Sequence, residues 1–228
     1  METEISSRTA GRLLGEILRA LMQEVPFVIL RNYEDLPLLW KNDVDLLIRP
    51  SDLVRSSEIC LRVANAEAKD CAISVLTRFH LRSILVACSD RLLRIDLFTA
   101  MSKGWIIYAD TDKILAARSR RHELFCIPDP YHELLLIAAK ELFAYGYIRP
   151  RYHSKLTCHD WARSQESSRM LFDQHLTDSG CLLIAKALIN PEVKGRPGVL
   201  PGSLLRPAAI FSWMLQRLNN PKLLRVDS

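Results

Sequence analysis

Two carboxylates stand one residue apart at the start of an apolar run, in Asp43-Val44-Asp45 followed by Leu46-Leu47-Ile48. The run predicts a buried strand, and side chains at i and i+2 of a strand lie on the same face. Asp43 and Asp45 should therefore project together, and two such charges repel each other unless a cation lies between them. Mg²⁺ is commonly held by one or two carboxylates plus substrate phosphates. The pattern predicts metal-assisted phosphate chemistry.

A third carboxylate, Asp96, interrupts the strand-like segment 92–98. An acid between apolar neighbours is costly unless it is paired, and Asp is depleted from strands. Three carboxylates on adjacent strands can hold two ions, one for the attacking hydroxyl and one for the leaving phosphate. We therefore predict that Asp43, Asp45 and Asp96 are catalytic metal ligands for Mg²⁺ or Mn²⁺. An ion pair between Asp96 and Arg94 or Arg82 is the alternative.

The elements that must position these acids follow from periodicity and turn signals. Helical spacing predicts an amphipathic helix over 9–24. A second helix is predicted over 51–66, with Pro50 ending the preceding strand and Ser51 as the N-cap. Short apolar runs predict strands, and the strands at 71–76, 81–87 and 92–98 are expected to be antiparallel neighbours. These strands are 26–30, 43–48, 71–76, 81–87, 92–98 and 124–127, with a further edge strand at 105–108 and a short helix at 110–118.

The character of the chain changes near residue 128. Asp129-Pro130 starts a strong helix over 131–145, which ends at Gly146. The remainder predicts helices and loops, with a Pro- and Gly-rich loop at 191–207 and a last helix at 208–218. We expect an α+β fold, with a small mixed or antiparallel sheet and flanking helices in 1–128 and a helical domain in 129–228.

Composition narrows the partners. The net charge is +5, from 31 basic and 26 acidic residues that are well mixed, which suits a nucleotide or another anionic substrate. Nucleic acid is not expected as a partner, and the oligomeric state is left open. No apolar stretch reaches the roughly 20 residues of a membrane span, and the polar N-terminus predicts no signal peptide. Six cysteines without a C-x-x-C pair favour free thiols in a reducing cytoplasm over disulfides.

The order of these features resembles the nucleotidyltransferase superfamily of the DNA polymerase beta type. Its pattern is a helix, a strand ending in Gly-Ser, a loop of about ten residues, an Asp-apolar-Asp strand and a later strand with a third Asp. This chain has the helix, the strand, Arg31-Asn32, the loop, Asp43-Val44-Asp45 and Asp96. The resemblance implies that the acids bind Mg²⁺ and a nucleoside triphosphate, and that a nucleoside monophosphate passes to an acceptor.

One departure concerns the phosphate clamp, because Arg31-Asn32 stands where the family has Gly-Ser. An Arg can bind phosphate through its fork of donors, so Arg31 and Asn32 are predicted to contact the nucleotide. The sequence Leu30-Arg31-Asn32-Tyr33, followed by Leu36-Pro37 and Asp43-Val44-Asp45, is similar to uncharacterised bacterial nucleotidyltransferase-like proteins. Many of those proteins are encoded among genes for polysaccharide biosynthesis. That similarity implies a small-molecule or carbohydrate acceptor. By the same resemblance Lys140 could reach the triphosphate; by physics alone it could snorkel to the surface.

Two rival functions remain open at this point. One is a nucleotidyltransferase fold used as a binding or toxin–antitoxin module, which the missing Gly-Ser favours and the three retained acids oppose. The other is a glycosyltransferase that uses D-x-D to hold a metal and a sugar nucleotide. That enzyme should carry a longer nucleotide-binding domain than the 42 residues before Asp43.

Overall fold

The computed structural model describes residues 2–38, 43–87, 92–103, 106–156, 160–193 and 204–206. The chain divides into two compact units. The first comprises Met1–Ala100 and Thr111–Asp129, and the second comprises Met101–Asp110 and Pro130–Ser228. The sequence predicts one boundary near residue 128. The compact units differ from that division in the segment 101–110, which groups with the later helices.

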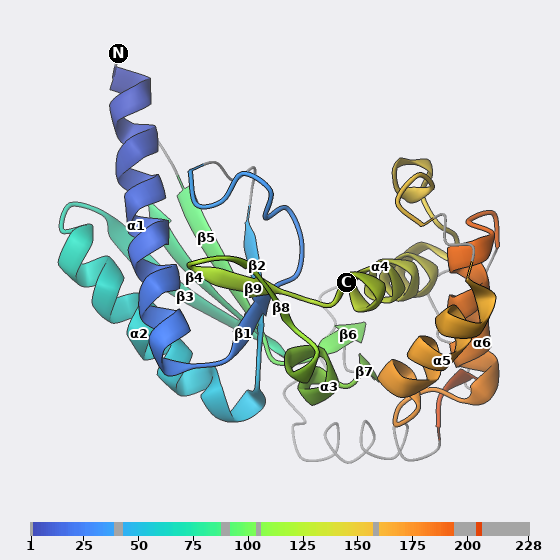
Figure 1. The fold of residues 1–228 in the computed structure, drawn as a ribbon. Helices are drawn as coiled ribbons and strands as arrows, with labels where there is room; N and C mark the ends of the chain where they lie inside the picture. The colour runs from blue at the N-terminus through green and yellow to red at the C-terminus, as the bar shows by residue number, and fades with distance from the viewer. Residues whose placement is uncertain are drawn as a thin grey trace, which may run out of the picture. The chain divides into compact units, whose positions relative to one another are not determined.

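A five-stranded mixed sheet forms the centre of the first unit (Figure 1). Its spatial order is β1-β2-β5-β4-β3; β2 and β5 are parallel, and every other neighbouring pair is antiparallel. The predicted α+β class, with a mixed sheet and flanking helices, is confirmed. The strands are β1 (Phe27–Ile29), β2 (Val44–Ile48), β3 (Ala72–Arg78), β4 (Leu81–Ala87) and β5 (Leu92–Phe98).

Two helices cover one face of this sheet, α1 (Glu2–Glu24) and α2 (Leu53–Glu67), the latter entered through the 3₁₀ turn η1 (Pro50–Asp52). Alternate strand residues such as Leu46 and Ile95 pack with both helices in one core. Each such side chain stabilises the fold by about 1.5–3 kcal/mol. Because side chains alternate along a strand, Asp45 and Asp96 lie on the opposite face.

A short helix and a hairpin complete the first unit: α3 (Thr111–Ala116), β8 (Ser119–His122) and β9 (Phe125–Ile127). Strand β9 matches the strand predicted at 124–127, and it is buried and lies beside β1. Strand β8 is missing from the sequence prediction. Its residues Ser119, Arg120 and Arg121 are exposed, so the strand has no apolar alternation that could reveal it.

The described residues of the second unit form a two-stranded sheet and three helices. The strands are β6 (Met101–Lys103) and β7 (Ile106–Ala109), which pair with each other. The helices are α4 (Pro130–Tyr145), α5 (Trp161–Phe172) and α6 (Asp178–Ile189), with a 3₁₀ turn η2 (Pro150–Tyr152). Asp160 and Thr177 cap α5 and α6 by accepting from backbone N–H groups. The helix predicted at 208–218 lies outside the described residues.

The cysteines divide into two kinds. Cys60, Cys126 and Cys181 are free and buried, and burial raises the pKa of the Cys60 thiol to about 12. Cys71 is in a disulfide, so the expectation of free thiols is wrong for this residue. Cys88 and Cys158 lie outside the described residues. The cysteine spacing, which lacks a C-x-x-C pair, does not indicate this disulfide.

None of the helices in the described part of the chain has both the length and the apolar character needed to cross a membrane.

Candidate functional site

The parallel pairing of β2 and β5 brings the predicted acids together. Its register sets Asp45 directly opposite Asp96, and Asp43 precedes β2 by one residue on the same face as Asp45. The two strands are separated in sequence by α2, β3 and β4. Local spacing therefore explains the nearness of Asp43 to Asp45, and the sheet order explains the nearness of Asp96.

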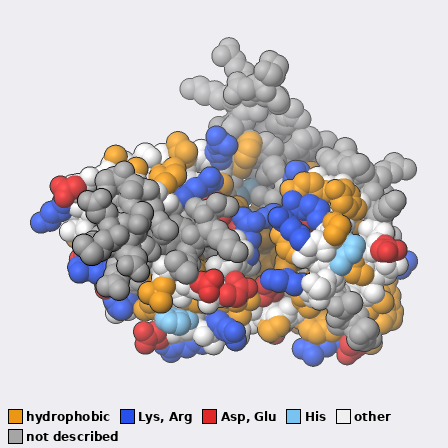
Figure 2. Space-filling view, turned by 90° about the horizontal axis from the view of Figure 1, so that it is seen from above, with side chains coloured by type: hydrophobic (Ala, Val, Ile, Leu, Met, Phe, Trp, Pro, Cys, Tyr) orange, Lys and Arg blue, Asp and Glu red, His pale blue; other side chains and the backbone are white. Residues whose placement is uncertain are grey.

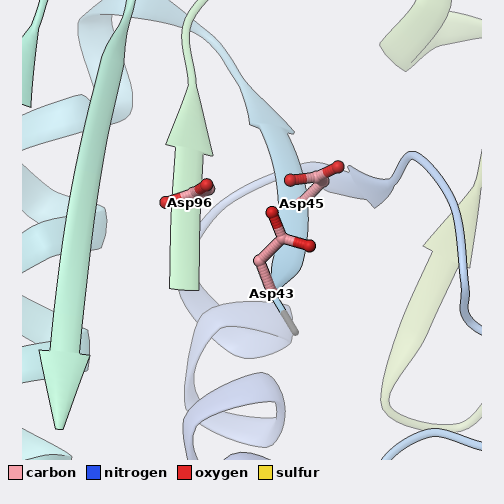
Figure 3. A group of neighbouring side chains, drawn as sticks. All are labelled: Asp43, Asp45 and Asp96. Carbon is pink, nitrogen blue, oxygen red and sulfur yellow. The ribbon is translucent and has the colours of Figure 1, made fainter. Parts of the chain in front are cut away.

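The three carboxylates form one cluster over the two strands (Figure 3). One oxygen from each lies within 4.8 Å of the others. Asp45 and Asp96 are almost fully buried, at 3% and 2% exposed, and Asp43 is partly exposed. The cluster is therefore open to a ligand on the side of Asp43.

The chemistry of the donor set fits a hard divalent cation. Mg²⁺ prefers carboxylate oxygens at about 2.0–2.1 Å, so two ligands on opposite sides of one ion lie about 4.2 Å apart. Small side-chain rotations would bring oxygens spread over 4.8 Å to that spacing. Asp43, Asp45 and Asp96 are the residues that would hold the metal.

Two arginines supply positive charge to the cluster. Arg31 donates from Nε to Asp45 Oδ2, and its Nη2 lies 3.6 Å from Asp43 Oδ2. Arg94 donates from Nε to Asp96 Oδ1 at 2.9 Å, and this hydrogen bond raises the pKa of Arg94 above its usual range. These partners offset part of the cost of burying Asp45 and Asp96. The alternative pairing of Asp96 with Arg94 is therefore present.

The position of Arg31 is set by the end of β1. The backbone N–H of Leu30 donates to the carbonyl oxygen of Asp45 at 2.9 Å, which continues the β1–β2 pairing beyond Ile29. Asn32 then turns the chain with φ of 55°. Asn is one of the few residue types other than Gly that adopt this left-handed region readily.

We expect Asn32→Ala to destabilise the protein by about 1–2 kcal/mol, because an Ala side chain clashes with its own backbone at this φ. Asn32→Gly should leave stability nearly unchanged, since Gly adopts the conformation freely. Urea-induced unfolding of the two variants measures the difference. Equal stabilities for the Ala and Gly variants would show that residue 32 does not hold a left-handed conformation.

Three other residues, Lys140, Ser83 and Arg94, differ in how they relate to the three-acid cluster. Lys140 is exposed on α4 in the second unit, and its contact with a triphosphate stays a prediction. Ser83, which the sequence did not single out, is opposite Asp96 on β4 and only 4% exposed. The sequence predicts Arg94 only as an alternative ion-pair partner of Asp96. Its place two residues before Asp96 on a strand indicates that the two side chains share a face of the sheet.

Comparisons of this chain with protein-family models, with curated proteins and with solved structures give no significant match. The functional interpretation therefore depends on the geometry of the cluster and on the resemblance of the sequence pattern.

Proposed function

We propose that this protein is a metal-dependent nucleotidyltransferase of the DNA polymerase beta type, acting on a small-molecule or carbohydrate hydroxyl. The observation that carries the proposal is the convergence of Asp43, Asp45 and Asp96 on the face of β2 and β5 that points away from the core with α1 and α2. Buried acids are costly to a fold, so two buried carboxylates and a partly exposed third in one cluster favour a role in binding cations. An Asp-apolar-Asp pair on one strand and a third Asp on its neighbour also match the pattern of the nucleotidyltransferase superfamily.

In the proposed reaction the acceptor oxygen forms a bond to the α-phosphorus, the bond to the β-phosphate bridging oxygen breaks, and pyrophosphate leaves. Bound Mg²⁺ would stabilise the charge that develops on the phosphate oxygens. Asp43 and Asp45 would hold the metal–nucleotide complex. Asp96 would complete the ligand set and help remove the acceptor's proton. Arg31, with Asn32 beside it, would donate hydrogen bonds to phosphate oxygens.

The surface charge supports a small anionic ligand over a polymer. On the face shown in Figure 2, basic side chains are scattered among acidic and apolar ones. Binding to a nucleic-acid backbone depends on clustered Lys and Arg that neutralise many phosphates. The mixed charges on this face, together with the cluster of Asp43, Asp45 and Asp96, instead suit a metal-bound nucleotide.

The ion pairs of Arg31 favour a second candidate, a binding module that needs no metal. A guanidinium held by Asp45 and Asp43 already supplies the positive charge that a metal would bring. In that case the fold would bind a partner or nucleotide without transferring a phosphate group.

The two candidates are separated by a transfer assay. The purified protein is incubated with Mg²⁺ or Mn²⁺, each of the four α-labelled nucleoside triphosphates, and a panel of sugars, sugar phosphates and other hydroxyl compounds. Labelled acceptor together with pyrophosphate is the expected result, and Asp43→Asn should form neither. Metal-independent binding of a nucleotide with no transfer to any acceptor would favour the binding module.

A further inference from the structure

Arg31 contacts the same acids that would bind the metal. Its Nε donates to Asp45 Oδ2, and its Nη2 is 3.6 Å from Asp43 Oδ2. The guanidinium thus bridges two of the three carboxylates in the cluster. The Arg31 side chain is 36% exposed, whereas that of Asp45 is 4% exposed, so the arginine is the partner with room to move.

A guanidinium and a small divalent cation compete for the same carboxylate oxygens. Mg²⁺ requires near-octahedral geometry with oxygens at about 2.0–2.1 Å, and a donor bound to Asp45 Oδ2 obstructs the approach of an ion to that oxygen. The two positive charges also repel each other strongly where water is partly excluded. A metal that binds Asp43 and Asp45 through the oxygens that Arg31 contacts must therefore displace the guanidinium.

The charge balance makes this displacement depend on a second ligand. Three carboxylates face the positive charges of Arg31 and Arg94, which leaves one negative charge uncompensated. A divalent ion alone makes the cluster net positive and leaves Arg31 without its partners. A phosphate group that enters with the metal restores the balance and offers the displaced guanidinium a bidentate acceptor.

We propose that Arg31 makes this site selective for a metal ion that arrives with phosphate over a metal ion alone. The inference deepens the proposed function, since it concerns the same cluster. Arg31 opposes free divalent cations by occupying Asp45 and Asp43, and it favours the metal–phosphate complex by transferring its hydrogen bonds to phosphate. A glycine at this position, as in the family pattern, would exert neither effect.

The test compares wild type, Arg31→Ala and Arg31→Lys by calorimetry and by Mn²⁺ electron paramagnetic resonance. Mn²⁺ alone is one probe, and inorganic tripolyphosphate with Mn²⁺ is the other. We expect Arg31→Ala to bind Mn²⁺ alone about tenfold more tightly and tripolyphosphate with Mn²⁺ about tenfold more weakly, because one charge-assisted contact is exchanged in each case. Arg31→Lys should fall between the two, since Lys keeps the charge and loses the fork.

Two controls make the result specific. Arg12→Ala removes an arginine from an exposed ion pair with Glu67, and it should change neither affinity. Asp45→Asn combined with Arg31→Ala should remove the gain in Mn²⁺ affinity, which separates the cluster from adventitious surface acids.

Opposite changes for the two probes support the inference. The inference is overturned if Arg31→Ala weakens the binding of both probes, or if it leaves both affinities unchanged. It is also overturned if no variant binds Mn²⁺. Opposite changes in a protein that transfers no nucleotide would leave the inference intact and contradict the proposed function.

Discussion

Asp45→Asn is expected to lower the proposed Mg²⁺-dependent nucleotidyl transfer at least a thousandfold while the protein stays folded. Asp45 is nearly buried, lies opposite Asp96 and contributes to the only three-acid cluster found among the described residues. A neutral amide of the same shape removes one charge from the metal site. Losing several kcal/mol of transition-state stabilisation corresponds to about three orders of magnitude in rate. Initial rates of pyrophosphate release at saturating Mg²⁺ provide the measurement.

The control for this variant is Asp112→Asn. Asp112 is 73% exposed and pairs with Arg49 at the surface, where an ion pair contributes about 0–1 kcal/mol. Its transfer rate should equal that of wild type. Circular dichroism and thermal unfolding establish that both variants are folded. If Asp45→Asn retains most of the transfer activity, Asp45 is not a metal ligand and the site assignment is wrong.

Arg149→Ala is expected to destabilise the second unit by about 3–5 kcal/mol, because it leaves a buried carboxylate without its cation. Glu141 is 1% exposed and accepts from Arg149 Nε and Nη2, each at 2.6 Å. The backbone N–H of Arg149 donates to the same carboxylate at 3.3 Å, and the pair raises the pKa of Arg149 above its usual range. The guanidinium also lies 4.0 Å from the centre of the Tyr145 ring.

Urea-induced unfolding, followed by fluorescence and circular dichroism, measures this loss. Arg151→Ala is the matched control, because Arg151 belongs to the 3₁₀ turn that directly follows Arg149, and its guanidinium lies 4.7 Å from the Tyr152 ring centre. A cation–π contact at an exposed residue contributes about 0.5–1 kcal/mol, so this variant should lose no more than that. Equal losses in the two variants would mean that the Glu141–Arg149 pair adds nothing beyond a surface contact.

The strands that build the cluster were predictable because their apolar runs are bounded by turns. Residues 81–87 and 92–98 match β4 and β5 as the structure has them. The charged strand β8 and the three-residue β6 lack that signal. Strand length and apolar alternation are what a sequence displays, and neither is present in these two elements.

The convergence of the three acids was partly predictable from the sequence, and the contacts that they make were less so. Asp43 and Asp45 share a face because of strand periodicity alone. The pairing of Asp45 with Asp96 depends on which strands become neighbours, and sheet order is not written in local spacing. Arg31 was expected to bind phosphate, and its contacts with Asp45 and Asp43 depend on where β1 ends relative to β2.

The alternation of β2 and β5 has a consequence for how this site can change during evolution. Leu46 and Leu97 belong to the core, and they are the residues that follow Asp45 and Asp96 on the two strands. A slip of one residue in either strand would move an acid into the core and a leucine out of it. Insertions or deletions within these strands therefore disrupt folding itself and do not merely alter the chemistry of the cluster. The cluster should diverge through its loops and its arginines, while the spacing of its acids stays fixed.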